Sequence, residues 1–295
     1  MAAIFTASPT AGAQDTATEP APSPDAAVEA AGWGALASRH GDGSQSGQPV
    51  PVPAPGSGVW APTPPATAGL TSWLGSARPF ALRSPDQYRP PASRLESSRY
   101  RRDLDELRRL GGASSTERTE EQTLVARFWG DQPIDQNQRA LRAQAAKLGW
   151  GVSPTARLFA AVLTSEVDAI IACWDAKYTY HFWRPWQSAP TVEPGWTPLL
   201  ATPNHPEYPS AHGCLTGALA YSLAGIMGTD AIDVEIDAAN IGVTRSYPTR
   251  DALLEEVGDA RVWAGIHYRH SVDTGKQLAK RVVRYNLSRN FQINE

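Results

Sequence analysis

Apolar residues recur at spacings of three and four along most of the chain after residue 97, and this is the period of an amphipathic helix. In residues 98–110, for example, Tyr100, Leu104 and Leu107 share one face before two glycines end the pattern. Alternation typical of strands is almost absent. The pattern therefore predicts an all-α fold, a helical bundle, with helices over residues 98–110, 115–129, 136–148, 154–183, 210–227, 231–240, 249–266 and 271–291.

The longest predicted helix, residues 154–183, is also the most apolar. Ser153 suits the cap position before it, and Pro154 is tolerated in the first turn because its missing N–H would have no helical partner there. Leu158 and Val162 begin an apolar face that continues along the segment. We therefore expect this helix to lie buried at the centre of the bundle.

The chain before residue 98 has a different composition. Eleven of the 25 prolines lie in the first 65 residues, among Ala, Gly and Ser, and such a segment buries too little apolar surface to offset its ordering entropy. Aromatic residues return after residue 58. We predict a disordered arm over residues 1–57, an extended segment packed on the core over 58–97, and the helical bundle over 98–295, which would carry any catalytic residues.

Charge and composition exclude several classes of function. With 27 Lys and Arg against 30 Asp and Glu, the formal charge of −3 gives no basic field to hold a nucleic acid. No apolar run reaches the length of about 18 residues expected of a membrane span. The N-terminal residues 1–15 contain Ala11-Gly12-Ala13, which resembles a weak export signal and slightly favours a secreted or periplasmic location.

Residues with potential chemistry gather in one part of the sequence. Five of the six histidines lie between residues 181 and 270, and only four of the 27 basic residues are lysines. One of these, Lys177, precedes Arg184 by seven residues at the end of the long apolar helix, so the two cations lie on nearly the same face. Alternatively, the Lys177 stem packs on apolar surface while Arg184 pairs with Asp175.

Two further motifs follow in order. Pro209-Ser210-Ala211-His212 stands where a proline-rich loop becomes a helix, and free amides at a helix N-terminus bind anions. Alternatively, Ser210 is an ordinary N-cap. Arg261 precedes His267 by six residues, and both side chains suit one bound anion unless the segment is simply a basic surface helix. Together the three motifs supply two arginines, a lysine, a hydroxyl and two histidines, all suited to one tetrahedral oxyanion.

This set, Lys-x6-Arg-Pro, Pro-Ser-x-His and Arg-x5-His in that order, resembles the signature of the vanadium-dependent haloperoxidases and the related type 2 phosphatidic acid phosphatases. The likeness runs from about Gly58 to Tyr285 and implies an all-α bundle that binds vanadate, with phosphate able to occupy the same site. It implies that His267 is the axial vanadium ligand and that His212 is the acid or base. The resemblance assigns the equatorial oxygens to Lys177, Arg184, Ser210, the amide of Ala211, and Arg261.

The chain departs from the family pattern at several positions. Ala211 stands where the family usually has glycine, which places a methyl group near the expected anion. Ser271 stands where the phosphatases often have an aspartate. Family members also often have a longer helical N-terminal region, so a partner copy in a homo-oligomer is expected to complete the bundle.

The resemblance also implies substrates. His205 matches a histidine of bromoperoxidase-like members, and Trp174 matches a tryptophan on the halide side of chloroperoxidase-like sites, although a plain core tryptophan is an equal interpretation. The first hypothesis is a haloperoxidase that uses hydrogen peroxide to oxidise a halide, bromide favoured, to hypohalous acid for a small organic acceptor, with Lys177 polarising bound peroxide. The second is a phosphate monoester hydrolase that forms a phosphohistidine at His267, and the missing acid at position 271 counts against it. The third is a non-catalytic oxyanion-binding protein.

Overall fold

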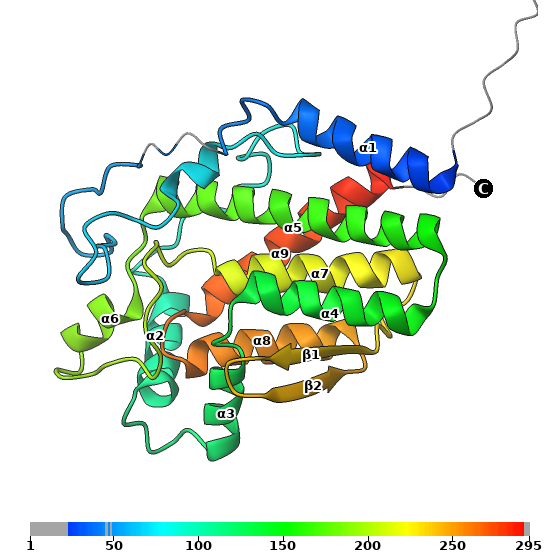
Figure 1. The fold of residues 1–295 in the computed structure, drawn as a ribbon. Helices are drawn as coiled ribbons and strands as arrows, with labels where there is room; N and C mark the ends of the chain where they lie inside the picture. Colours follow the sequence, from blue (N-terminus) through cyan, green and yellow to red (C-terminus); the bar gives the residue numbers. More distant parts are fainter. Residues whose placement is uncertain (1–22, 45–46, 48, 292–295) are drawn as a thin grey trace, which may run out of the picture.

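The computed structural model describes residues 23–44, 47 and 49–291, and the proposed export signal lies outside them. Within this range the chain is mainly helical, as predicted, with one two-stranded sheet. Figure 1 shows the order of elements along the chain. The helices and strands are α1 (Pro24–Ser38), the 3-10 helix η1 (Ser72–Ser76), α2 (Ser98–Gly111), α3 (Glu120–Phe128), α4 (Pro133–Leu148), α5 (Val152–Tyr180), α6 (Pro185–Ser188), the 3-10 helix η2 (Ala189–Thr191), α7 (Ala211–Met227), β1 (Val234–Ala238), β2 (Val243–Tyr247), α8 (Arg250–Trp263) and α9 (Arg269–Asn290).

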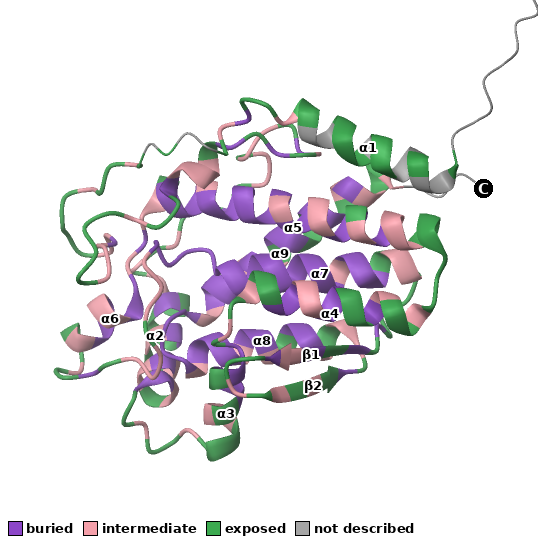
Figure 2. Ribbon diagram, viewed as in Figure 1, coloured by how far each residue is buried: buried purple, intermediate pink, exposed green. Residues whose placement is uncertain are grey.

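Helices α5, α7 and α9 form the centre of the bundle, and α7 also contacts α8 and α4 (Figure 1). Burial follows this arrangement, since the purple residues of Figure 2 concentrate on α7 and on the faces turned toward it. The expected central position of α5 is therefore shared with α7, whose residues are buried almost throughout its first 14 positions. No described helix is long and apolar enough to cross a membrane.

The end of α5 redirects the chain into the site. The helix ends at Tyr180, and His181 follows it with φ 44°, in the left-handed region that most side chains avoid. The His181 amide still donates to the Lys177 carbonyl at 2.8 Å, which closes the helix. The chain then runs extended through Phe182, which bridges to Val59 of the preceding segment. This turn places Lys177 and Arg184 on either side of the helix end.

The prediction of a helix over residues 231–240 is wrong. Residues Val234–Ala238 form β1, which pairs antiparallel with β2 in the register Val234 to Tyr247. Val234, Ile236 and Ala238 are buried, whereas the acidic residues between them are not, which is a period of two. In so short a segment the two periods are hard to tell apart, and packing against the bundle decides for the strand.

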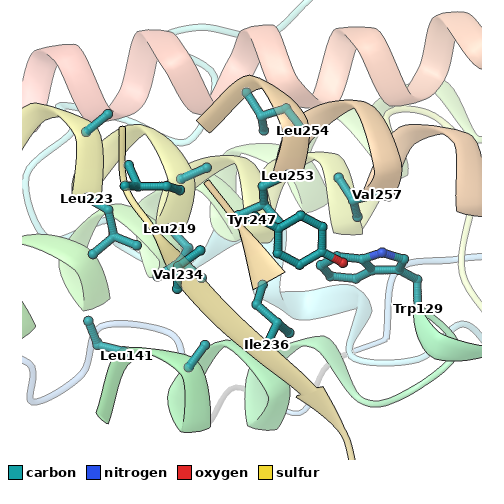
Figure 3. Close-up of a cluster of buried hydrophobic side chains, with 14 of the residues drawn as sticks. Trp129, Leu141, Leu219, Leu223, Val234, Ile236, Tyr247, Leu253, Leu254 and Val257 are labelled. Carbon is teal, nitrogen blue, oxygen red and sulfur yellow. The ribbon is translucent and has the colours of Figure 1, made fainter. Parts of the chain in front are cut away.

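Much of the apolar core lies beneath this hairpin (Figure 3). Ile236 and Tyr247 of the strands, Leu219 and Leu223 of α7, and Trp129 after α3 belong to one buried cluster. The cluster also includes side chains of α4 and α8, so the hairpin covers one flank of the bundle. Burial on this scale fixes how α7 and α8 lie relative to each other.

The segment before α2 contains more structure than predicted. Helix α1 lies where we expect a disordered arm, because the alanines of this stretch favour a helix and Pro24 suits its first position. Residues 49–97 are mostly non-helical apart from η1. They pack on α5, where the Asp168 carboxylate accepts hydrogen bonds from the amides of Phe80, Ala81 and Leu82 at 2.6, 2.9 and 3.0 Å. The division of the chain into three segments stays a prediction.

Helices α7 and α9 approach closely at the start of each helix. A Cβ added to Gly275 would lie 2.6 Å from the Ser210 carbonyl oxygen, and one added to Gly213 would lie 2.8 Å from the Val272 carbonyl oxygen. Neither position accepts a side chain without a backbone shift. The Ser210 amide donates to the Ser271 carbonyl across this contact at 3.1 Å. The contact therefore holds the first turn of α7 beside the chain that follows His267.

Candidate oxyanion site

The structure brings the residues of the three sequence motifs together in the interior of the bundle. Lys177 lies in the last turn of α5, Ser210 and His212 at the start of α7, Arg261 in the last turn of α8, and His267 between α8 and α9. Each is buried, and Lys177 and Arg184 are 0 % exposed. Cations with so little solvent contact need anionic or hydrogen-bonding partners.

Arg184 lies at the centre of this cluster. Its Nε donates to the His205 carbonyl at 2.9 Å, and its Nη1 donates to the Ile266 carbonyl at 2.8 Å. The same Nη1 lies 3.2 Å from His267 Nε2, and Nη2 lies 3.0 Å from His205 Nδ1. The guanidinium therefore joins the loop before α7 to the loop after α8 and points its planar fork at His267.

The other two cations are held by backbone carbonyls. Lys177 Nζ donates to the carbonyls of Pro206 and Glu207 at 2.7 and 2.9 Å. Arg261 Nη1 donates to the Trp129 carbonyl. None of these contacts is with a carboxylate, so the positive charges of the cluster are solvated by dipoles and remain available to an anion.

His267 is oriented by a carboxylate that sequence reasoning did not find. Its Nδ1 lies 2.7 Å from Oε1 of Glu207, and this oxygen also accepts the Tyr268 amide at 3.1 Å. An oxygen that already accepts from an amide is an acceptor, so the proton between the two side chains belongs to Nδ1. The Nε2 atom of His267 is therefore unprotonated and carries a lone pair on the side of Arg184.

The sequence contains a weak signal for Glu207. It lies three residues before Ser210, in the same loop as His205, and it is the one acid between the second motif and the turn at Pro194. Nothing in that spacing indicates a contact with a side chain 60 positions away. The contact depends on how the loop packs against the α8–α9 connection.

Several buried polar atoms of the cluster have no partner among the described residues. They include Ser210 Oγ, His212 Nε2 and Arg261 Nε. Ser210 makes no side-chain cap to α7, and the first amide to find a helical partner is that of Cys214, which donates to the Ser210 carbonyl at 3.1 Å. Buried polar groups are normally paired, so the two donors among them, the Ser210 hydroxyl and Arg261 Nε, fit an oxyanion.

The electrostatics of the cluster favour neutral histidines. Burial lowers the pKa of His267 well below its usual value, and the charges of Arg184, Lys177 and Arg261 lower it further. Burial and Arg261 lower the pKa of His212 in the same way, with a hydrogen bond to the Trp129 backbone opposing them. Burial also lowers the pKa of Lys177 to about 8. An anion in the cluster would oppose each of these shifts.

The structure contradicts the alternative interpretations of the three motifs, in which their residues have only structural roles. Asp175 pairs with Arg89 through two hydrogen bonds of 2.6 and 2.7 Å and does not contact Arg184. Ser210 does not cap α7 through its side chain. Arg261 is 3 % exposed, so its helix is not a basic surface helix.

The rings of Trp174 and His205 contact each other next to the buried cations. Their rings lie 4.8 Å apart, and Lys177 Nζ lies 5.7 Å from the Trp174 ring. Burial, followed by Lys177 and Arg184, lowers the pKa of His205 well below its usual value. Ala211 belongs to the apolar cluster that includes Cys173 and Trp174, so its methyl group takes part in the packing between α5 and α7.

Comparison with family models gives a match over the second half of the chain. The model of the "VCPO second helical-bundle domain" matches residues 157–294, a span that contains all three motifs. Residues 157–294 are therefore similar to this domain of the vanadium haloperoxidase family. No curated protein matches the chain.

Solved structures of the vanadium haloperoxidase type share the fold. A bacterial vanadium-dependent iodoperoxidase is 24% identical with a TM-score of 0.77, over 88% of this chain and 67% of its own. A holo-type bacterial vanadium-dependent chloroperoxidase is 16% identical with a TM-score of 0.67, over 86% of this chain and 69% of its own. An apo-type chloroperoxidase is 18% identical with a TM-score of 0.61, over 75% of this chain and 56% of its own.

Proposed function

We propose that the protein binds vanadate in the oxyanion site and uses hydrogen peroxide to oxidise a halide to hypohalous acid, which halogenates a small organic acceptor. One observation carries the proposal. Three buried cations act on a histidine whose Nε2 is unprotonated, and within the described residues none of the three forms an ion pair with a carboxylate. Such a cluster suits a tetrahedral oxyanion that one histidine bonds at its central atom.

The residues present fit the cofactor. Arg184, Lys177 and Arg261 would hold its oxygens, with Ser210 Oγ and the Ala211 amide completing the set. His267 Nε2 would bond the metal, because Glu207 holds the Nδ1 proton away from it. When bound, vanadate supplies Lewis-acid chemistry that activates peroxide without a change in its oxidation state.

The remaining groups would position the substrates and the protons. His212 is neutral and its Nε2 has no partner among the described residues, so it can accept a proton from incoming peroxide. Lys177 would polarise the bound peroxide. Bromide is the proposed halide, with Trp174 and His205 as the wall that it meets.

A phosphate monoester hydrolase is the second candidate. The contact between Glu207 and His267 favours this function, whereas the sequence motifs alone count against it. The absence of an aspartate at position 271 counts against a phosphatase, but Glu207, in the loop before α7, supplies a carboxylate to His267 Nδ1. In this reaction the bound anion would oppose the lowering of the His212 pKa, so that His212 binds a proton. His267 Nε2 attacks phosphorus while His212 gives this proton to the leaving alkoxide. Water activated by His212 then releases phosphate.

The first experiment measures both activities on one preparation. Phosphate ester hydrolysis is assayed before orthovanadate is added. The protein is then incubated with orthovanadate, the excess is removed, and bromination of a dimedone-type acceptor is followed with peroxide and bromide, then with chloride and with iodide. Vanadate-dependent halogenation is the expected result, and hydrolysis that vanadate inhibits, without halogenation, would assign the protein to the phosphatases.

A thermal denaturation series separates binding from turnover. A ligand that binds only the folded protein raises its stability by RT ln(1 + [L]/Kd), about 2.7 kcal/mol at a ligand concentration of about 100 times Kd. Vanadate and phosphate should both raise the midpoint of the wild type but not that of His267→Ala to the same extent. Stabilisation by both anions with neither activity would identify a non-catalytic oxyanion-binding protein.

A further inference from the structure

A second group of reactive side chains lies outside the oxyanion site, in a pocket of about 560 Å³. The pocket is formed by the loop before α2, by the first turns of α9 and by Tyr208. It includes none of the residues that we assign to the oxyanion. Two of its lining residues are Ser93 and His270.

Ser93, His270 and Asp103 form a chain of hydrogen bonds at one side of this pocket. Ser93 Oγ lies 2.6 Å from His270 Nε2, and His270 Nδ1 lies 2.6 Å from Asp103 Oδ2. The residues come from three separate parts of the structure: the loop before α2, α2 itself, and α9. A nucleophile, a base within hydrogen-bonding distance and a third group that orients the base are the components of nucleophilic acyl transfer.

The hydrogen bonds also fix the direction in which protons move. Asp103 Oδ2 accepts the His270 amide at 2.9 Å as well as the ring, so it is an acceptor and Nδ1 carries the ring proton. His270 Nε2 is then free to accept the proton of the Ser93 hydroxyl. Asp103 and His270 are both buried, whereas Ser93 is only partly buried and faces the pocket.

The charges around the pocket indicate the kind of substrate. Arg94, Arg99 and Arg281 line it, against one acid, Asp273. Within the described part of the chain, the amides of Ser93 and Arg94 donate to no protein group, so they are available to an oxyanion. The pocket therefore suits an ester that carries an additional negative charge.

We propose that Ser93, His270 and Asp103 form a second catalytic site that hydrolyses carboxylic esters with an anionic group. Ser93 Oγ attacks the ester carbon as its proton passes to His270 Nε2. The C–O bond to the alcohol breaks, and the leaving alkoxide takes the proton from His270, which leaves an acyl group on Ser93. Water, losing a proton to His270, then releases the carboxylic acid and restores the Ser93 hydroxyl.

The test combines covalent labelling with hydrolysis. The full-length protein is treated with a fluorophosphonate, and the site of the adduct is determined by peptide mass spectrometry. Hydrolysis of 4-nitrophenyl hemisuccinate, an anionic ester, is compared with that of 4-nitrophenyl acetate. We expect an adduct on Ser93 and a higher kcat/KM for the anionic ester.

Three variants make the result specific. Ser93→Ala should lose both the adduct and the hydrolysis, while Ser98→Ala, an exposed serine outside the pocket, should keep both. Asp103→Asn should lower kcat by at least tenfold with little change in KM, and its circular dichroism and melting curve check that it folds. His267→Ala should hydrolyse the ester as the wild type does, which separates this activity from the oxyanion site.

Two outcomes would overturn the proposal. One is a wild-type protein that neither forms an adduct nor hydrolyses the anionic ester above the buffer rate. The other is a folded Ser93→Ala variant that retains labelling or hydrolysis. Loss of ester hydrolysis in a folded His267→Ala variant would also overturn it, because this result would assign the reaction to the oxyanion site instead.

Discussion

The protein contains two histidines, three positions apart, that are held in the same way but face different groups. In each, Nδ1 lies within 2.7 Å of a carboxylate oxygen that also accepts a nearby backbone amide: Glu207 for His267, and Asp103 for His270. In each the free nitrogen is Nε2. The difference lies in what Nε2 meets, which is the Arg184 guanidinium for His267 and the Ser93 hydroxyl for His270.

Under the roles proposed for His267 and His270, the carboxylate does not decide what a histidine does. A carboxylate on Nδ1 only fixes the tautomer and the ring orientation. Next to buried cations, an unprotonated Nε2 suits a bond to the central atom of an oxyanion. Next to a hydroxyl at the wall of a pocket, it suits proton abstraction. The environment of the second nitrogen is therefore the feature to test.

Removing His267 should have the largest effect. His267→Ala leaves no atom to bond vanadium or phosphorus, so halogenation or phosphate ester hydrolysis should fall by at least about a thousandfold, equivalent to about 4 kcal/mol. The exposed His40→Ala is the matched control and should keep full activity. Far-ultraviolet circular dichroism checks the fold. A folded His267→Ala variant with wild-type turnover would show that this histidine is not the ligand.

Changing the carboxylate partner should have a smaller effect. Glu207→Gln can keep the shape but offers His267 a weaker acceptor, and loss of such a partner costs about 10- to 100-fold in metal affinity or activity. Vanadate affinity, measured by titration, should fall by this factor, and the pH profile of turnover should shift. Glu193→Gln, which removes a carboxylate from a surface ion pair with Arg108, should leave both unchanged. A Glu207→Gln variant with unchanged vanadate affinity and pH profile would show that Glu207 does not position His267.

Replacing the planar guanidinium of Arg261 by the ammonium group of a lysine should have a still smaller effect on anion binding. Arg261→Lys keeps a cation but loses part of the hydrogen bonding, and a hydrogen bond to a charged group contributes about 2 kcal/mol. We expect phosphate and vanadate to bind roughly thirtyfold more weakly, as measured by calorimetry. Unchanged anion affinity in this variant would count against Arg261 as a ligand.

The smallest effect is expected from pH. Because burial lowers the pKa of Lys177 to about 8, the free protein loses this charge as pH rises through 8. Phosphate affinity should therefore fall by about tenfold between about pH 7 and about pH 9. The effect on stability has the opposite sign. Without an anion, the buried charge of Lys177 destabilises the folded protein below pH 8. The free energy of unfolding should therefore increase as the pH rises from about 8 toward 10.5, the ordinary pKa of lysine. Lys177→Met should remove both dependences.

The grouping of the candidate oxyanion residues was predictable because they occur in short, ordered motifs. Ser210 and His212 lie at one helix start, so local spacing indicates their shared direction. Helix positions were predictable for the same reason, since a period near 3.6 extends over whole segments. The prediction that Lys177 and Arg184 share a helix face is wrong, because α5 ends at Tyr180 and the turn at His181, rather than helical periodicity, brings Arg184 to the site. The structure confirms the all-α fold but not the short helix at 231–240, where five strand residues carry too little pattern.

The residues that sequence reasoning missed are linked only by tertiary contacts. Glu207 reaches His267 across 60 positions, and Ser93 reaches His270 across 177. Taken by itself, His270 looks structural, and no spacing connects it with Ser93 or Asp103. Such pairs depend on how loops pack on the bundle, and a local pattern contains no information on that.

The close contact between α7 and α9 limits which sequences can build this site. Gly275 faces the Ser210 carbonyl and Gly213 faces that of Val272, so even alanine at either position would displace the turn that presents Ser210. In a saturation mutagenesis library selected for anion binding, these two glycines should tolerate as few replacements as the charged ligands, although neither touches an anion. The exposed Gly34, which has open space around it, should tolerate almost any residue.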